Sequence, residues 1–174
     1  MIKLSAAVAF GAFAVFAVFA VEAIAQPAAP LDVRATMQNR VNPAMLAIWD
    51  IGNNAMNDDA VLDAKLMDDD KWARIAAAAG QLSAASKDIA AANGFIAASP
   101  GNTAVDEGEI TMAAVQQHLD HDPAGIKQMA AALADHAEKI ATAARAKDAS
   151  TAGELIGETD QVCEACHMTY WYPE

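Results

Sequence analysis

Apolar side chains recur every three or four residues along several long segments of this chain. This spacing places them on one face of an α-helix. The clearest segment has a seam made of Trp72, Ile75, Ala79, Leu82, Ser86, Ile89, Asn93 and Ile96. The turn-forming run at residues 99–102, Ser-Pro-Gly-Asn, is expected to stop this helix. We therefore predict a long helix that continues through Ile96.

Two more helices follow toward the C-terminus. Asp122 and Pro123 are typical of an N-cap followed by a first-turn proline. The seam after them consists of Ile126, Met129, Leu133, His136, Ile140 and Ala143. A last helix is expected to open at Ser150 or Thr151, because Thr151 and Glu154 fit a capping box. Its stripe contains Leu155, Thr159, Val162 and Cys166.

The N-terminal half supplies the remaining helix. A helical stretch runs from about Leu31 to Met56, and Asn42-Pro43 interrupts it, so a kink or a fresh helix start is expected there. Residues 57–70 are polar and loop-like, and residues 111–119 indicate a short helix in a connection. Amphipathic helices without strand alternation predict an all-α fold, a four-helix up-down bundle.

The first 25 residues differ from the rest. Lys3 precedes an apolar stretch from Leu4 to Val21, and Ala23-Ile24-Ala25 resembles a signal-peptidase site. We predict a secretory signal over residues 1–25, cleaved before Gln26, and one helical domain over residues 26–174. The alternative is a retained membrane anchor, because the stretch is close to the ~18 residues that span a bilayer.

Charge narrows the choice of partners. The net charge is −12, which argues against nucleic acid or an anionic membrane surface and favours redox partner proteins with basic surfaces. After removal of the signal, no membrane association is expected.

The chain has only two cysteines, and they occur in the string CEACHMTYWYP near its end. In Cys-x-x-Cys-His, two thiols bond to the vinyl groups of haem and the histidine binds its iron. Cys163, Cys166 and His167 therefore predict one covalent haem c at one end of the bundle. The alternatives are a dithiol redox centre and a zinc site that recruits His118 and His121.

A four-helix sequence that ends in CxxCHxxY resembles the class II cytochromes c, which include cytochrome c′ and its low-spin relatives. The matching residues are Cys163, Cys166, His167 and Tyr170. The chain departs from the usual pattern because Met168 and Thr169 stand where a basic residue is common. The resemblance implies a homodimer through the first two helices, and it also implies that a gas-binding protein with five-coordinate iron is a candidate.

The second iron ligand must come from upstream, because Met168 adjoins His167. Met37 is expected at the level of the haem, whereas Met45 lies eight residues further along the first helix, ~12 Å along its axis. We predict Met37 as the sixth ligand. Met45, His118, His121 or no residue at all remain alternatives.

Other residues receive supporting roles. Arg34 and Arg40 are the cations closest to Met37 in sequence, and are candidates to bind the haem propionates. Tyr170 and Trp171 are expected to cover the histidine side of the haem. His136 is expected to be a hydrogen-bonded core residue, and Trp49 and Trp72 are placed at the opposite end of the bundle.

These observations favour a periplasmic electron carrier with His167 and Met37 as iron ligands. No paired carboxylates, Ser-His-Asp set or phosphate loop indicates an enzymatic site, so no enzymatic activity is expected. Binding of nitric oxide or carbon monoxide to five-coordinate iron is the alternative function.

Overall fold

The computed structural model describes residues 29–57 and 61–172. The expected signal peptide, residues 1–25, lies outside the described residues. Among the helices of the described ranges, none is both long enough and apolar enough to cross a membrane.

The first helical segment begins after the two-residue strand β1 (Leu31–Asp32) and contains α1 (Val33–Thr36), the π-helical turn η1 (Met37–Val41) and α2 (Asn42–Asn53). The side chain of Asp32 caps α1 by accepting a hydrogen bond from the backbone of Ala35 at 2.8 Å. The N–H of Asn42 bonds to the carbonyl of Met37, five residues earlier. Pro43 follows this widened turn, so the helix continues past the proline instead of restarting.

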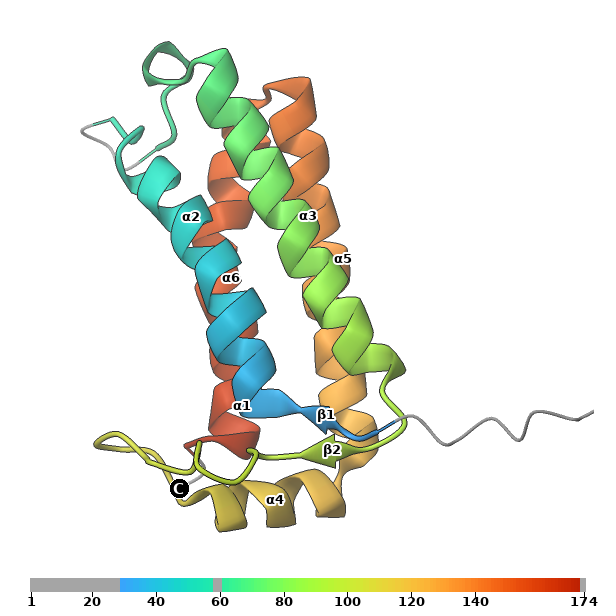
Figure 1. Cartoon of the computed structure of the whole chain (residues 1–174). Coiled ribbons are helices and arrows are strands. Elements are labelled where there is room, and N and C mark those ends of the chain that lie inside the picture. The colour runs from blue at the N-terminus through green and yellow to red at the C-terminus, as the bar shows by residue number, and fades with distance from the viewer. Residues whose placement is uncertain (1–28, 58–60, 173–174) are drawn as a thin grey trace, which may run out of the picture.

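The long helices α3 (Asp69–Ala91) and α5 (Pro123–Ala146) pack against each other along most of their length (Figure 1). The predicted continuation of α3 through Ile96 is wrong. The helix ends at Ala91, Ala92 adopts an extended conformation, and Phe95–Ile96 form strand β2. Strand β2 pairs in parallel with β1, with Leu31 opposite Phe95. Backbone hydrogen bonds between β1 and β2 therefore form in place of a further turn of α3.

The expected short helix is confirmed as α4 (Met112–His121), which lies across one end of the bundle (Figure 1). Asp122 caps α5, with Pro123 in its first turn, as predicted. Helix α5 ends at Ala146, and the φ of its C-cap residue Lys147, 55°, lies in the left-handed region.

The last helix, α6 (Ala149–Tyr170), starts one residue earlier than expected. Its cap is Asp148, whose carboxylate accepts a hydrogen bond from the N–H of Thr151 at 3.1 Å. The predicted capping box of Thr151 and Glu154 is therefore wrong, because a carboxylate closer to the helix start already satisfies that donor. A 3₁₀ turn, η2 (Ala64–Leu66), lies in the connection before α3.

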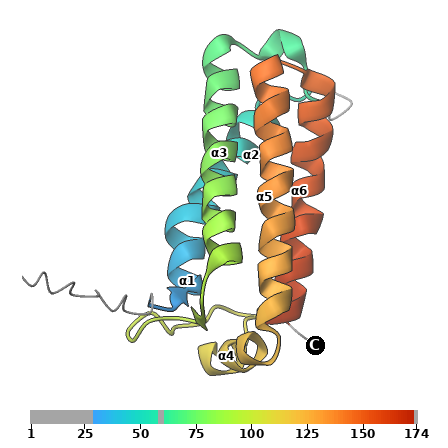
Figure 2. The ribbon, with the colours of Figure 1, turned by 90° about the vertical axis from the view of Figure 1, so that its right-hand side faces the viewer.

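The α1–η1–α2 segment, α3, α5 and α6 form the predicted four-helix bundle (Figure 2). The interior contains many alanines besides isoleucine and leucine, so the long helices approach closely. Segment α2 packs mainly on α3 and contacts α6 far less. Helix α4 and strands β1 and β2 gather at the end of the bundle where α1 begins (Figure 1).

Candidate functional site: a haem pocket between the first and last helices

Cys163, Cys166 and His167 lie on the last turns of α6, and all three side chains are half-buried. The two thiols are free. Burial raises the pKa of Cys163, with a smaller contribution from the charge of Asp160. Burial also raises the pKa of Cys166 to about 11. Both thiols are therefore protonated at neutral pH before any cofactor is attached.

His167 has the protonation state that iron binding requires. Burial lowers the pKa of its imidazole, although the charges of Asp160 and Glu109 act in the opposite direction. The ring is consequently neutral near pH 7 and retains a nitrogen lone pair. It also meets the ring of Tyr172 edge-on, with 5.9 Å between the ring centroids.

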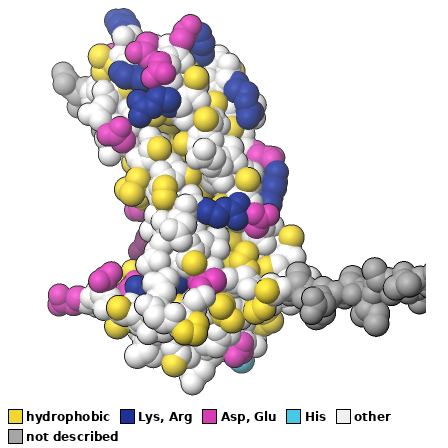
Figure 3. Space-filling view, viewed as in Figure 1, with side chains coloured by type: hydrophobic (Ala, Val, Ile, Leu, Met, Phe, Trp, Pro, Cys, Tyr) yellow, Lys and Arg dark blue, Asp and Glu magenta, His cyan; other side chains and the backbone are white. Residues whose placement is uncertain are grey.

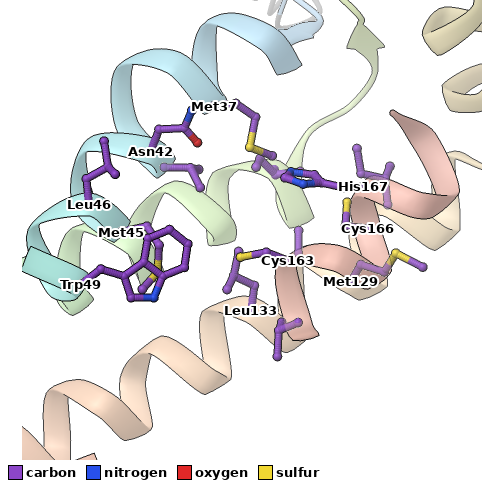
Figure 4. Close-up of a pocket in the computed structure, with 15 residues that line it drawn as sticks. Met37, Asn42, Met45, Leu46, Trp49, Met129, Leu133, Cys163, Cys166 and His167 are labelled. Atoms are coloured by element: carbon purple, nitrogen blue, oxygen red, sulfur yellow. The ribbon is translucent and has the colours of Figure 1, made fainter. Parts of the chain in front are cut away.

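A cavity of about 250 Å³ lies between the first helical segment and α6, with α5 along one wall. Figure 4 shows residues that line it. The side chains from the first segment are Met37, Val41, Asn42, Met45, Leu46 and Trp49. The side chains from α3, α5 and α6 are Ile89, Ile126, Met129, Ala130, Leu133, Val162, Cys163, Cys166 and His167. Apart from the motif residues and Asn42, this lining is almost entirely apolar.

A second cavity of about 180 Å³ adjoins the first. Both cavities are lined by Met37, Asn42, Ile126, Cys166 and His167. The remaining lining of the second cavity is more polar and consists of Val33, Arg34, Gln38, Asp106, Glu109, Tyr170, Trp171 and Tyr172. The two cavities together present an apolar side and a polar side, which suits an amphiphilic macrocycle such as haem.

Met37 lies opposite the motif. Its sulfur points toward the imidazole of His167 in the close-up, and its side chain is half-buried (Figure 4). Met45 lines only the first cavity and is almost completely buried, with 3% of its surface exposed. The geometry thus brings both candidate methionines to the pocket, but only Met37 shares both cavities with His167.

The two tryptophans are placed differently. Trp72 is buried in the core, as expected, outside the residues that line either cavity. The placement of Trp49 away from the haem is wrong, because this residue lines the first cavity (Figure 4). The cavity runs along α2 beyond Met45, since α2 and α6 are not closely packed.

The two arginines also have different positions. Arg34 is buried, lines the second cavity and forms an ion pair with Glu109 at 3.3 Å. Its Nε atom is buried without a hydrogen-bond partner among the described residues. Arg40 is exposed, forms an ion pair with Asp88 at 2.7 Å and lies outside the described residues that line the two cavities. The prediction that Arg40 binds the haem propionates is therefore corrected. Arg40 lies six positions after Arg34, which places it on another face of the helix.

Tyr170 is buried at the end of α6 and lines the second cavity. Its hydroxyl donates a hydrogen bond to the carbonyl of Asp122 at 2.8 Å. Burial raises its pKa to about 12.

The histidines considered as rivals lie elsewhere. His118 and His121 are in the last turn of α4, outside the lining of both cavities in the described ranges. His136 is buried, and its Nε2 lies 2.8 Å from the carbonyl oxygen of Leu155 and 3.1 Å from Oγ1 of Thr159. The prediction that it is a hydrogen-bonded core residue is confirmed.

Sequence reasoning missed several residues of the site. Asn42 and Leu46 belong to a helix whose position was predicted, but their orientation toward the cavity depends on the rotation of that helix. Glu109 belongs to a connection without periodicity. Its contacts with Arg34 and Trp171 span 75 and 62 residues of sequence, and no local signal could have indicated them.

The donor set fits haem. Cys163 and Cys166 are neighbours on one face of α6, and a neutral imidazole follows directly. The apolar walls suit the macrocycle, while the buried Nε of Arg34 offers a donor to an anionic group. These features are sufficient for a c-type haem site.

Comparison with known families agrees with this geometry. The family model described as Cytochrome C′ matches residues 51–171, which include the haem motif and Tyr170. The match begins after Met37 and Met45, so it does not bear on the sixth ligand. Comparison with curated proteins gave no match, and comparison with solved structures gave none either. The family match covers well over half of the chain and carries its implication of covalently bound haem c, and the protein therefore belongs to the cytochrome c′ family.

Proposed function

We propose that this protein is a periplasmic electron carrier with one haem c, whose iron His167 and Met37 would hold. The observation that carries the proposal is the position of Met37, which faces His167 across the pocket (Figure 4). When bound, haem c supplies reversible one-electron chemistry. No enzymatic reaction forms part of the proposal.

The residues of the motif hold the cofactor. The thiols of Cys163 and Cys166 would hold the macrocycle at the last turns of α6 through its two vinyl groups. The neutral imidazole of His167 would offer its nitrogen lone pair to iron. The thioether of Met37 is a soft, neutral donor, and such a ligand raises the reduction potential relative to a second histidine.

The apolar walls keep water from the iron and hold the ligands in place. Val41, Met45 and Leu133 are all buried at this site. These buried neighbours would limit the movement of the cofactor between the ferric and ferrous states, and small movement favours fast electron exchange.

The location and partners belong to the same proposal. The sequence of residues 1–25 is typical of a secretory signal, and export precedes attachment of haem c. Helix α6 carries the motif together with four exposed acidic residues, Glu154, Glu158, Asp160 and Glu164, and no lysine or arginine. This charge favours redox partners with basic surfaces. Leu46 on α2 is 61% exposed. This exposure supports a homodimer through the first two helices of the bundle, the α1–η1–α2 segment and α3.

The alternative function is binding of a small gas such as nitric oxide or carbon monoxide. It is favoured by the half-buried state of Met37, which is less tightly packed than Met45. If Met37 only packs beside the cofactor, the apolar cavity leaves the iron five-coordinate and accessible.

An absorption spectrum distinguishes the two functions. The purified protein is expected to show low-spin bands with a methionine–iron charge-transfer band in the ferric form. In Met37→Ala this band is expected to disappear, because the thioether is removed. Met45→Ala is the matched control, since it shortens a methionine of the same cavity and should leave the band in place.

The opposite results favour the alternative. High-spin bands in the unmodified protein, together with ready binding of carbon monoxide, would reject Met37 as a ligand. Loss of the band in Met45→Ala but not in Met37→Ala would assign the ligand to Met45 instead.

A further inference from the structure

Glu109 is a buried carboxylate in the connection between β2 and α4, and its side chain is 12% exposed. It accepts hydrogen bonds from the indole Nε1 of Trp171 at 3.1 Å and from the N–H of Asp106 at 2.9 Å. It also pairs with Nη1 of Arg34 at 3.3 Å. Three donors from three segments thus hold the carboxylate in one orientation.

The same connection is joined to the end of the helix that carries His167. The N–H of Ile110 bonds to the carbonyl of Trp171 at 3.4 Å, and the N–H of Trp171 bonds to the carbonyl of His167 at 2.7 Å. Glu109 and His167 both line the second cavity. The carboxylate is therefore fixed on the histidine side of the pocket.

Other charged side chains near this pocket either have a weaker effect on the potential at His167 or offset part of the charge of Glu109. Asp106 and Asp160 are exposed, so water and salt screen them. Arg34 is buried and offsets part of the charge of Glu109. Removal of the charge of Glu109 would therefore leave the buried charge of Arg34 without its ion-pair partner.

We propose that Glu109 is a positioning residue that lowers the reduction potential of the haem bound by His167. The ferric form carries one positive charge more than the ferrous form. A fixed negative charge beside the histidine ligand therefore stabilises the ferric form. The usual basic residue after the motif is absent here, and Glu109 balances the charge of Arg34 on this side of the pocket. The inference requires haem at His167 but not Met37 as a ligand.

The test is a redox titration of the full-length protein with attached haem. Glu109→Gln removes the charge and keeps the shape of the side chain, so the potential is expected to become more positive. The ferrous-to-ferric ratio at a fixed applied potential should rise by about threefold to tenfold, where tenfold corresponds to about 59 mV. Glu109→Asp keeps the charge and should restore most of the original potential.

The matched control is Glu107→Gln, which removes the same charge from an exposed position in the same connection. It should shift the potential far less, because water screens that position. An unchanged potential in Glu109→Gln would overturn the proposal. An equal shift in Glu107→Gln would do the same, since it would assign the effect to the overall charge of the protein.

A second variant covers the case in which Glu109→Gln does not fold. Trp171→Phe removes one donor to the carboxylate and leaves its charge, which can then turn toward water. A smaller positive shift is expected, and no shift would count against Glu109. The absorption spectrum of each variant separates this result from the ligand question, because replacement of Glu109 should leave the axial-ligand bands unchanged.

Discussion

At the scale of single residues, Tyr170 lies where three helices meet. Its hydroxyl bonds to Asp122, the residue that ends α4 and begins α5, and its ring is buried at the end of α6. Gly125 leaves room for this contact, because a Cβ atom there would lie 2.6 Å from the hydroxyl of Tyr170. This phenol group therefore links the end of α6, which carries the haem motif, to the junction of α4 and α5.

Replacement of Tyr170 by phenylalanine should reveal this contribution. The variant loses one hydrogen bond but keeps the buried ring, so the free energy of unfolding is expected to fall by about 1 kcal/mol. Thermal unfolding of the haem-loaded protein measures the change. Tyr172→Phe is the control, since Tyr172 is 38% exposed and its hydroxyl is expected to contribute little. Equal stability of Tyr170→Phe and the unmodified protein would contradict this account.

Residues with local signals could be predicted from the sequence, and residues that depend on distant contacts could not. Cys163, Cys166 and His167 were recognisable because their chemistry requires a fixed spacing along one helix. The level of Met37 along the first helix could also be predicted, and Met37 lines the same cavity as His167. Glu109 and Trp49 required knowledge of how connections fold and how far a cavity extends.

At the scale of elements, Asp32 connects the start of the first helix to the chain that follows β2. One oxygen of its carboxylate caps α1, and the other accepts hydrogen bonds from the backbone and hydroxyl of Ser99. Burial acts to raise the pKa of Asp32, but the hydrogen bonds from Ser99 and Ala35 together outweigh it and lower the pKa.

This shift gives a pH dependence of stability. Because the pKa of Asp32 is lower in the folded state, its contribution is present above its unfolded pKa, ~3.9, and is lost as the pH falls through the folded value. Asp32→Asn should therefore lose less stability than the unmodified protein between about pH 4 and pH 2. Urea unfolding across this range measures the difference.

The exposed residue Asp135 supplies the control for Asp32. Asp135→Asn removes one surface charge and should leave the acid dependence close to that of the unmodified protein. An identical acid dependence in Asp32→Asn and the unmodified protein would mean that Asp32 is not responsible.

Periodicity predicted the existence of every long helix but not every boundary. The three-four spacing of apolar residues in α3 extends through Ile96 in the sequence. The chain nevertheless leaves the helix at Ala92, and the strand that follows pairs with β1. A two-residue strand has no pattern of its own, and its partner lies more than 60 residues away in sequence. The start of α6 was similarly decided by a carboxylate, Asp148, that precedes the expected cap.

At the scale of the whole molecule, charge is unevenly distributed. On the face shown in Figure 3, lysine and arginine side chains gather mainly at the end opposite α4. The haem motif lies at the other end, on a helix whose charged side chains are all acidic. The net charge of −12 is thus unevenly distributed along the bundle axis, with acidic side chains on the helix that carries the haem motif.

Electron exchange with a small redox protein of positive net charge should therefore slow as ionic strength rises. Opposite charges steer the two proteins together at low salt, and ions screen this attraction above about 0.1 M. Stopped-flow measurements over a salt series give the rate constants. A redox protein of negative net charge should show the reverse trend, and a salt-independent rate with the basic partner would contradict the predicted steering.

The π-helical turn η1 contains one residue more than a regular α-helical path through the same turn needs. Deletion of one residue within residues 37–41 would convert this turn to regular helix. The side chains before the deletion would then be turned by about 100° relative to those after it. The side chain of Met37 would then no longer point toward His167. Descendants of one ancestral gene could in this way acquire or abandon a methionine ligand by insertion or deletion, with every residue of the haem motif unchanged.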